Sequence, residues 1–235
     1  MPSEGRERRL GHVRLGVLGG TFNPIHRGHL HLARSVRSLF SLSRVLFVVA
    51  AAPPHKPPKS LIALAHRYAM VCLATAGDPS FVPSLVELEA KASPYSVDTM
   101  RKITCGPGRG LEVFFIAGGD SLRDVHTWQE SGKLLSRYNI VFVNRPGVDA
   151  GDFREHLPEK VWDRVCDCTG MGPGRVRRRI GEPHRGNRLF LVECDAPDIS
   201  ATAIRRQAAS GGDFRAAVPG PVHDYIQKLR LYGDR

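Results

Sequence analysis

The chain lacks an apolar run long enough to cross a membrane. Its longest uninterrupted apolar run, Val45 to Ala52, covers eight residues, whereas a membrane-spanning helix needs about 20. The first fourteen residues, MPSEGRERRLGHVR, carry charged groups and lack the apolar stretch of a secretory signal. We therefore expect a cytoplasmic protein with no membrane partner.

Cysteine is scarce, and its placement argues against a disulfide framework. The five cysteines are scattered along a chain that is too long to depend on covalent staples. They are Cys72, Cys105, Cys166, Cys168 and Cys194. A metal could in principle join the Cys166–Cys168 pair to Cys194 or His184, but no second pair follows at the spacing of a zinc ribbon or finger. We expect free thiols and no metal held by protein side chains.

Two well-known phosphate-binding motifs are absent. The chain contains no G-x-x-x-x-G-K-[ST] sequence, which argues against a P-loop kinase or ATPase. No G-x-G-x-x-G follows the first expected strand, which argues against a dinucleotide-dependent oxidoreductase. If the protein binds a nucleotide, it does so through a different loop.

Acidic residues are also in short supply. The chain has 34 Lys and Arg against 23 Asp and Glu, a net charge of +11. Residues 1–14 contribute +2 and residues 170–188 contribute +5, so two short segments carry most of the excess. No recognition helix, RNP aromatic pattern or finger spacing accompanies this charge. Nucleic acid is therefore not the expected partner, and a basic nucleic-acid-binding module without catalysis is kept as the alternative from another functional class.

Strand-like and helix-like segments alternate along the chain. With 42% hydrophobic and 24% charged residues among 235, the chain can bury one core. Short apolar runs between helical stripes predict a Rossmann-like α/β fold, an open parallel sheet with helices on both faces, in a single domain. The expected strands are 14–18, 45–50, 81–88, 111–117, 139–144 and 189–193, and the expected helices are 29–39, 61–76, 97–103, 200–210 and 222–229.

The stretch from Val148 to Arg188 breaks this rhythm. It holds one short amphipathic piece, Glu159 to Val165, and then an Arg- and Gly-rich stretch. Segments of such composition without apolar periodicity are typical of irregular surface loops, so we expect a loop around Arg175 to Arg179. We divide the chain into a flexible tail at 1–13 and a domain at 14–235 with a variable or flexible segment at 148–188.

The most informative segment follows the first expected strand. It reads Gly19-Gly20-Thr21-Phe22-Asn23-Pro24-Ile25-His26-Arg27-Gly28-His29. Open parallel sheets bind nucleotides outside the carboxyl ends of their strands. Paired glycines let the backbone approach an anion, and the next helix offers unpaired N–H groups. His26 and His29 face the same side of the first turn, where they can donate to phosphate oxygens. The alternative is a glycine turn beside two surface histidines.

A second candidate phosphate site follows the last expected strand. It reads Ile199-Ser200-Ala201-Thr202-Ala203-Ile204-Arg205-Arg206. Ser200 can cap the helix that begins there, Thr202 or nearby N–H groups can bind phosphate, and Arg205 can pair with a developing negative charge. The alternative is a capped surface helix with two arginines.

Together the two segments resemble the HIGH-type nucleotidyltransferases, and specifically the bacterial nicotinate-nucleotide adenylyltransferases. The patterns that carry the resemblance are G-G-T-F-[DN]-P-x-H-x-G-H and I-S-x-T-x-I-R. Further segments similar to the family follow in family order: Pro53 to Lys56, Ser93 to Thr99, Phe115 to Ser121, Thr127-Trp128, Arg145 to Gly147 and Val218 to Tyr232. The resemblance covers residues 15–147 and 189–232.

The resemblance implies an in-line displacement in NAD biosynthesis. The phosphate of nicotinate mononucleotide attacks the α-phosphorus of ATP, pyrophosphate leaves, and nicotinate adenine dinucleotide forms. The implied cofactor is Mg²⁺, held by the ATP phosphates and not by protein side chains. Because the nucleophile is already an anion, no general base is needed, and catalysis rests on positioning and on neutralising charge.

The resemblance also divides the site residues between the substrates. His26, His29 and Arg205 are the implied catalytic residues, with His29 stabilising the α-phosphoryl group in the transition state. The residues implied to bind ATP are Gly19, Gly20, Thr21, Phe22, Gly118, Asp120, Ser121, Ile199, Ser200 and Thr202. The residues implied to bind the mononucleotide are Asn23, Lys56, Tyr95, Ser96, Thr99, Trp128 and Arg145.

Substrate choice is expected around Tyr95 to Thr99 and at Trp128. A flat indole can stack on the pyridine ring, and backbone N–H groups at 96–99 can receive the nicotinate carboxylate. The alternatives are that Trp128 is a half-buried core aromatic and that Asp98 and Thr99 only begin a helix.

The chain departs from the family pattern at two places. Asn23 stands where the family often has Asp, so a hydrogen-bonding role survives there and a carboxylate role does not. The turn before Pro53 reads Ala50-Ala51-Ala52, where many relatives carry Asn, so it offers no polar side chain. A preference for nicotinamide mononucleotide, another HIGH-type transfer, and a homo-oligomeric state stay open at this point.

Overall fold

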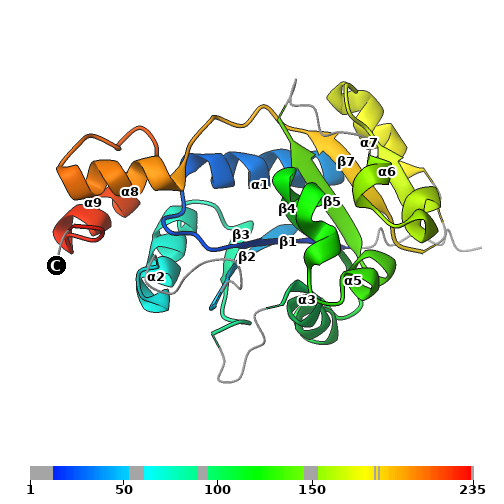
Figure 1. Ribbon diagram of the computed structural model, residues 1–235, viewed down its shortest axis with the longest axis horizontal. Helices are drawn as coiled ribbons and strands as arrows, with labels where there is room; N and C mark the ends of the chain where they lie inside the picture. The colour runs from blue at the N-terminus through cyan, green and yellow to red at the C-terminus, as the bar shows by residue number, and fades with distance from the viewer. Residues whose placement is uncertain are drawn as a thin grey trace, which may run out of the picture.

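The computed structural model describes residues 13–52, 61–88, 95–145, 153–182, 184 and 186–233. Within these residues seven strands form one sheet, in the order β3-β2-β1-β4-β5-β7-β6 (Figure 1). Every paired neighbour is parallel, which confirms the expected open parallel sheet. The strands are β1 (Arg14–Gly20), β2 (Arg44–Val49), β3 (Phe81–Ser84), β4 (Glu112–Gly118), β5 (Asn139–Asn144), β6 (Val165–Asp167) and β7 (Leu189–Glu193).

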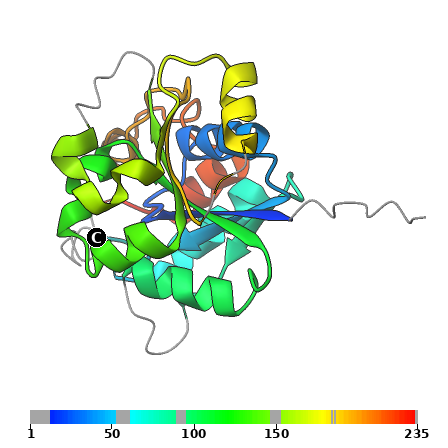
Figure 2. The ribbon, with the colours of Figure 1, turned by 90° about the vertical axis from the view of Figure 1, so that its right-hand side faces the viewer.

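Helices cover both faces of the sheet, and the two groups bury separate apolar clusters (Figures 1 and 2). The helices of the first face are α1 (Arg27–Phe40), α2 (Leu64–Thr75), α7 (Pro173–Gly181), α8 (Ala201–Ser210) and α9 (Gly220–Lys228). The second face carries α3 (Ser96–Cys105), α4 (Asp120–Asp124), η2 (Val125–Thr127), α5 (Ser131–Arg137) and η3 (Glu159–Arg164), and the short α6 (Phe153–His156) packs beside α4.

The central strands are apolar on both sides. In β4, Val113 and Phe115 join the cluster under α3, while Phe114 and Ile116 join the cluster under α1. A strand that is covered on both faces needs an apolar side chain at every position. This explains why these segments read as continuous apolar runs and not as alternating ones.

The stretch after Val148 is more regular than the sequence suggested. Val165 to Asp167 forms β6, which extends the sheet beyond β7. The Arg-rich stretch forms α7, whose Val176 and Ile180 are buried. The expected surface position of Arg175 to Arg179 is confirmed, since its four arginines are exposed. The expected loop is wrong, because two apolar residues four apart are enough to dock a helix on the cluster beside α1. The variability and flexibility of 148–188 stay predictions.

Several short elements were not expected from the sequence. α4, η2, α5 and α6 are each seven residues or fewer, too short to show a clear apolar period. The strand expected at 81–88 ends at Ser84, because the chain then turns and the N–H of Leu88 donates to the carbonyl of Leu85 at 2.8 Å.

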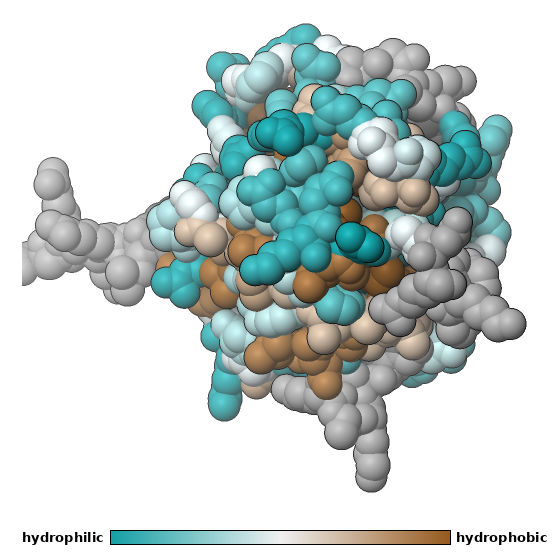
Figure 3. Space-filling model, turned by 90° about the vertical axis from the view of Figure 1, so that its left-hand side faces the viewer, coloured by the Kyte–Doolittle hydropathy of each residue, from teal (hydrophilic) through white to brown (hydrophobic). Residues whose placement is uncertain are grey.

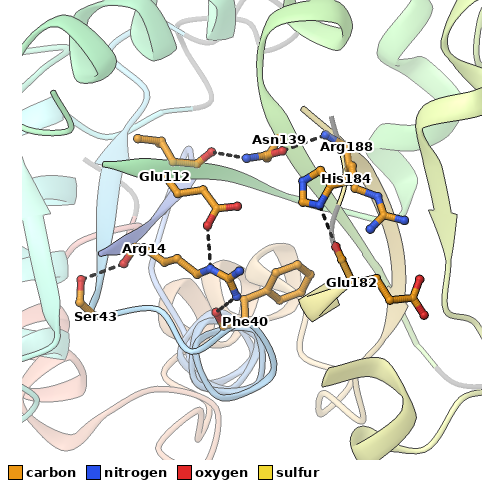
Figure 4. A network of polar contacts seen from close by, with 9 residues as sticks. Arg14, Phe40, Ser43, Glu112, Asn139, Glu182, His184 and Arg188 are labelled. Atoms are coloured by element: carbon orange, nitrogen blue, oxygen red, sulfur yellow. Dashed lines mark hydrogen bonds and ion pairs between the residues drawn. The ribbon is translucent and has the colours of Figure 1, made fainter. Parts of the chain in front are cut away.

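The amino ends of the strands are tied together by a polar network (Figure 4). Arg14 at the start of β1 pairs with Glu112 of β4 at 2.7 Å and donates to the Phe40 carbonyl at 3.1 Å. The side chain of Asn139 accepts from the backbone N–H of Arg188 at 2.8 Å. These contacts hold β1, β4, β5 and β7 in register at their amino ends. The carboxyl ends are left to form the site.

The surface is mixed in character. Figure 3 faces the end of the molecule that carries α8 and α9, where hydrophilic residues and a band of hydrophobic residues lie side by side. Across the residues that the structure describes, no helix combines the length and hydropathy that crossing a bilayer would require.

Candidate functional site

The site lies at the point where the strand order reverses. From β1 the chain proceeds to β2 on one side, and from β4 it proceeds to β5 on the other. Helices that leave adjacent strands toward opposite faces open a crevice at the carboxyl ends, which is where ligands bind in such sheets. Two cavities occupy this crevice, and Gly118 at the end of β4 lines both.

The first cavity, the histidine cavity, has a volume of about 430 Å³. It lies at the start of α1 and at the ends of β4, β5 and β7. The residues that line it are His26, Gly28, His29, Leu32, Gly118, Gly119, Asp120, Val143, Asn144, Arg145, Cys194, Ala196, Pro197 and Ile199.

The second cavity, the tryptophan cavity, has a volume of about 400 Å³. It lies at the ends of β1, β2 and β4 and at the start of α3. The residues that line it are Gly19, Gly20, Thr21, Val48, Ala50, Glu87, Tyr95, Ser96, Thr99, Phe115, Ile116, Ala117, Gly118, Ser121, Thr127, Trp128 and Gln129.

The two histidines of the first motif lie together, as expected. Their rings stack with centroids 3.7 Å apart and an angle of 29° between planes. The backbone N–H of His26, the residue before α1, donates to Nδ1 of His29 at 3.2 Å. Because Nδ1 of His29 accepts, the ring proton sits on Nε2, and this nitrogen is the donor. The alternative of two surface histidines does not fit the burial of His26.

Phe22 packs against the histidine pair. Its ring packs edge-on against His29, with centroids 5.1 Å apart, and is buried. Its φ of 46° lies in the left-handed region, which is unusual for a bulky residue. Gly20 makes room for the ring, because a Cβ at that position would lie 2.8 Å from a Phe22 ring atom. Phe22 therefore acts on the cavity through His29.

His26 is held in its neutral form. The residue is only 8% exposed. Burial, and next the charge of Arg145, lowers the pKa of His26 to about 4. At neutral pH the imidazole is thus an uncharged hydrogen-bonding group. Arg145 lines the histidine cavity beside His26. Its guanidinium also pairs with the carboxylate of Asp198 at 2.5 Å.

The second motif connects α8 to the first. Ser200 caps α8, as expected, by accepting from the N–H of Ala203 at 3.4 Å. Arg205 donates to the carbonyl of Asn23 at 2.9 Å and to the Thr202 hydroxyl at 3.1 Å. Ile199 lines the histidine cavity, while Ser200, Thr202 and Arg205 lie beside it without lining it.

Asn23 is a buried connector between the first motif and the end of the chain. Its side chain is largely enclosed, at 4% exposure for the residue. Its Oδ1 accepts from the hydroxyl of Tyr232 at 3.1 Å, and burial raises the pKa of that phenol. Asn23 lines neither cavity, so the structure places it behind the motif.

Aromatic and hydroxyl side chains form the wall of the tryptophan cavity. Trp128 is half-buried and packs edge-on against Phe115, with centroids 6.2 Å apart. Trp128 therefore fits both interpretations from the sequence, because it packs against the apolar cluster as a core aromatic and also lines the cavity where a ring could stack. Tyr95, Ser96 and Thr99, at the start of α3, line the same cavity.

Sequence reasoning missed Glu87, a buried carboxyl in the tryptophan cavity. Its Oε1 accepts from the Thr99 hydroxyl at 2.5 Å, and its Oε2 accepts from the N–H of Ala51 at 3.2 Å. Burial raises the pKa of Glu87, and the two hydrogen bonds with the charges of Lys102 and Arg67 act in the opposite direction. A charged residue inside the apolar run 81–88 was the available signal.

Arg67 was also missed. It is 1% exposed and donates to the carbonyls of Thr21 and Ala50 at 2.8 and 2.7 Å, and to that of Ala51 at 3.1 Å. One guanidinium thus holds the loop after β1 and the turn after β2 together. The turn of three alanines works through its backbone: Arg67 binds its carbonyls and Glu87 binds its N–H. The signal was an arginine in line with Met70 and Val71 on the apolar stripe of α2.

The structure distributes some residues differently from the sequence-based division. Gly19, Gly20, Thr21 and Ser121, expected at ATP, line the tryptophan cavity. Arg145, expected at the mononucleotide, lines the histidine cavity together with Asp120. Lys56, the rest of Pro53 to Lys56, Ser93-Pro94 and Pro146-Gly147 lie outside the described residues.

The described residues offer no cage for a metal ion. They contain no group of three or more His, Cys, Asp or Glu side chains that could hold one. Asp120 is a single carboxylate on the histidine cavity. Mg²⁺ keeps several waters and is commonly bound through one or two carboxylates and substrate phosphates, so the donor set suits an ion that arrives with a triphosphate.

Comparison with known proteins gives one consistent family. Residues 17–207 match the family model described as Cytidylyltransferase-like. A protein of Geobacter metallireducens, named "Probable nicotinate-nucleotide adenylyltransferase", is 41% identical, covering 94% of this chain and 98% of that protein. A protein of the same name from Geotalea uraniireducens is 38% identical, covering 94% and 99%.

Solved structures share the fold. The nicotinic acid mononucleotide adenylyltransferase of Plasmodium falciparum, complexed with NaAD, superimposes with a TM-score of 0.66 at 17% sequence identity, covering 94% of this chain and 98% of that one. The same enzyme complexed with APC gives a TM-score of 0.64 at 17% identity over the same shares. At this identity the likeness concerns the arrangement of the chain.

Proposed function

Because the chain belongs to the nicotinate-nucleotide adenylyltransferases of the cytidylyltransferase-like family, we propose that its two cavities hold the two substrates of that reaction. The enzyme transfers AMP from ATP to nicotinate mononucleotide and forms nicotinate adenine dinucleotide and pyrophosphate, in NAD biosynthesis. ATP occupies the histidine cavity and the mononucleotide occupies the tryptophan cavity. The observation that carries this division is that the cavities adjoin at Gly118.

The cationic and hydrogen-bonding groups of the histidine cavity favour ATP as its ligand. His26 and His29 stack on one wall and Arg145 lies near them. Nε2–H of His29 donates to the α-phosphoryl group as charge builds on it. Neutral imidazoles suit this role, because they bind phosphate oxygens without retaining the product electrostatically. Arg205, Ser200 and Thr202 serve the outer phosphates from the start of α8, and Gly118, Asp120 and Ile199 contact the nucleoside.

The side chains and backbone groups of the tryptophan cavity favour the mononucleotide as its ligand. The Trp128 indole offers a face for the pyridine ring, and the first turn of α3 at Ser96 points backbone N–H groups toward a carboxylate. The end of β1, Gly19 to Thr21, faces the same cavity and binds the mononucleotide phosphate. The attacking oxygen of that phosphate then lies next to Gly118, where the tryptophan cavity meets the histidine cavity and its ATP.

The reaction then needs no proton acceptor. The mononucleotide phosphate is the nucleophile, the bond to the α-phosphorus forms as the bond to pyrophosphate breaks, and the protein positions both groups. The triphosphate oxygens would hold Mg²⁺, which would supply neutralising charge to the triphosphate when bound. A cytoplasmic location is consistent with the use of ATP and stays a proposal, as does a homo-oligomeric state.

A pyrophosphate-release assay with ATP, Mg²⁺ and nicotinate mononucleotide tests this function. The reaction is expected to release pyrophosphate and form the dinucleotide, and nicotinamide mononucleotide is expected to give a kcat/KM lower by about tenfold or more, because a buried site discriminates strongly by one charge. Equal kcat/KM values for the two mononucleotides would remove the nicotinate preference. Salt-sensitive binding of RNA or DNA without pyrophosphate release would favour the nucleic-acid-binding alternative.

A further inference from the structure

A pair of buried cysteines lies away from both cavities. Cys166 in β6 and Cys168 just after it have their Sγ atoms 3.7 Å apart. They are 0% and 1% exposed, and neither lines a cavity. Both belong to the apolar cluster that also contains Val176 and Ile180 of α7. Nothing in the transfer of AMP uses these two thiols.

The surroundings of the two sulfurs make them chemically unequal. The hydrogen bond with Cys168 and the charges of Arg188 and Arg179 lower the pKa of Cys166, while the same hydrogen bond and burial raise the pKa of Cys168. The positive charge of Arg179, on α7, is one of the influences that lower the pKa of Cys166. A thiolate beside arginines is the reactive form of cysteine. The pair therefore consists of a nucleophile and a neighbouring thiol that can resolve it.

We propose that Cys166 and Cys168 form a redox modification site that takes a hydroperoxide and closes to a disulfide. The Cys166 thiolate attacks the peroxide oxygen, an S–O bond forms, the O–O bond breaks, and the alcohol leaves with a proton. Cys168 then attacks the sulfur of the Cys166 sulfenic acid, and water leaves as the S–S bond forms. Two thiols are oxidised by two electrons, and one hydroperoxide is reduced to alcohol and water.

The geometry allows both steps after a small movement. The sulfurs must approach from 3.7 Å to about 2.05 Å. Access requires α7 to lift from the sheet, and α7 is a thin cover at the edge of the molecule beside α1 (Figures 1 and 2). Of its nine residues only Val176 and Ile180 are buried, and its four arginines are exposed. Helices with so few buried contacts open locally before the whole domain unfolds.

The pair is also connected to the histidine cavity. The N–H of Cys168 donates to the carbonyl of Leu191 in β7 at 2.9 Å. The N–H of Gly170 donates to the Glu193 carboxylate at 2.8 Å, and the next residue, Cys194, lines the cavity. Closure of the disulfide therefore pulls on the segment of β7 that leads into the site.

The experiment uses the full-length protein at neutral pH, treated with hydrogen peroxide, alkylated with iodoacetamide and digested with trypsin. Both cysteines fall in one tryptic peptide, Val165 to Arg175, so the disulfide appears as a peptide two hydrogens lighter and without alkylation. We expect this product, reversible by dithiothreitol. Two alkylated cysteines at a dose that oxidises the exposed Cys105 would overturn the proposal.

Variants distinguish the two sulfurs. With Cys168→Ser, the sulfenic acid of Cys166 should be trapped by dimedone, whereas Cys166→Ser should give no adduct at Cys168; the reverse pattern would overturn the assignment. Arg179→Gln should slow disulfide formation by about threefold or more, since the thiolate loses a partner. Its matched control is Arg178→Gln, at the exposed neighbouring position of α7, and equal rates for the two variants would contradict the role of Arg179.

The link to the cavity has its own readout, which rests on the proposed ATP site. Fully oxidised protein should show a KM for ATP raised by about twofold or more, the scale of a small displacement near a substrate, and dithiothreitol should restore it. The mass measurement decides the modification site even if the enzyme activity is of another kind. An unchanged KM in fully oxidised protein would overturn the link through β7.

Discussion

The hydroxyl of Thr99 donates to the carboxyl of Glu87 at 2.5 Å, and this bond joins the first turn of α3 to the segment that follows β3. The second oxygen of Glu87 receives the N–H of Ala51 from the turn after β2. One carboxyl group thus spans two walls of the tryptophan cavity. A residue that fixes cavity walls without touching the reacting phosphates should act on substrate binding more than on turnover.

Glu87→Gln is expected to raise the KM for nicotinate mononucleotide by about threefold to tenfold, and to leave the KM for ATP nearly unchanged. The glutamine amide has one acceptor oxygen in place of two, so either the Thr99 hydroxyl or the Ala51 N–H loses its acceptor. Steady-state kinetics with each substrate varied in turn measures the split. Glu112→Gln is the matched control, because Glu112 pairs with Arg14 at the amino ends of the strands, away from the tryptophan cavity at their carboxyl ends. Equal shifts in both KM values would contradict this position for Glu87.

His29→Ala is expected to lower kcat by about 10² or more, the scale expected when a transition-state donor is lost. Nδ1 of His29 is engaged by the N–H of His26, so Nε2–H is directed as the donor. Pyrophosphate release at saturating substrates measures the change. His31→Ala, on the exposed face of the same helix, should retain activity. A loss below about threefold in His29→Ala would mean that this histidine does not stabilise the transition state.

The folded state should lose stability in acid through His26. Burial, with Arg145, lowers the pKa of His26 to about 4, below the value of about 6.5 in an unfolded chain. Between these values the unfolded chain binds the proton and the folded one does not, so stability is complete above pH ~6.5 and falls toward pH ~4.

Urea unfolding at several pH values measures this effect. Between pH ~7 and ~4.5, the unfolding free energy of the wild type should fall by about 2 kcal/mol more than that of His26→Gln, whose side chain does not titrate. Parallel pH profiles for the two proteins would show that His26 is not held neutral by the fold.

Arg67→Met is expected to lower the free energy of unfolding by about 3 kcal/mol or more. Four backbone carbonyls, those of Ile62, Thr21, Ala50 and Ala51, lose their donor, and an unsatisfied buried acceptor costs about 1–3 kcal/mol. Arg67→Lys should recover only part of this loss, because an ammonium lacks the planar fork that reaches several carbonyls.

Arg101→Met on α3 serves as the control for Arg67, because the side chain of Arg101 is exposed and its pair with Asp98 lies on the surface. It should cost less than about 1 kcal/mol. Denaturant unfolding of the three variants measures the order, and an Arg67→Met protein as stable as Arg101→Met would show that the guanidinium does not hold the two loops.

The parts of the fold that sequence could predict are those with strong local signals. Continuous apolar runs identified the central strands, since a strand covered on both faces leaves no position for a polar residue. The first motif was informative because its glycines, histidines and helix start are neighbours in sequence. The stack of His26 on His29 follows from their spacing on one turn.

Other features depend on contacts between distant segments. α7 forms because Val176 and Ile180 dock beside α1, and two apolar residues among arginines give little local signal. The positions of Arg145 and Gly19 relative to the two cavities depend on which strands are neighbours, which composition and periodicity do not reveal. Arg67 and Glu87 did leave a signal: each is a charged residue within an otherwise apolar pattern.

The structure of the protein with a non-hydrolysable ATP analogue and nicotinate mononucleotide tests the central claim most directly. The α-phosphate should lie within about 3 Å of Nε2 of His29, with the mononucleotide phosphate on the Gly118 side in line with the leaving pyrophosphate. A triphosphate bound away from His26 and His29, or a pyridine ring outside the tryptophan cavity, would contradict it.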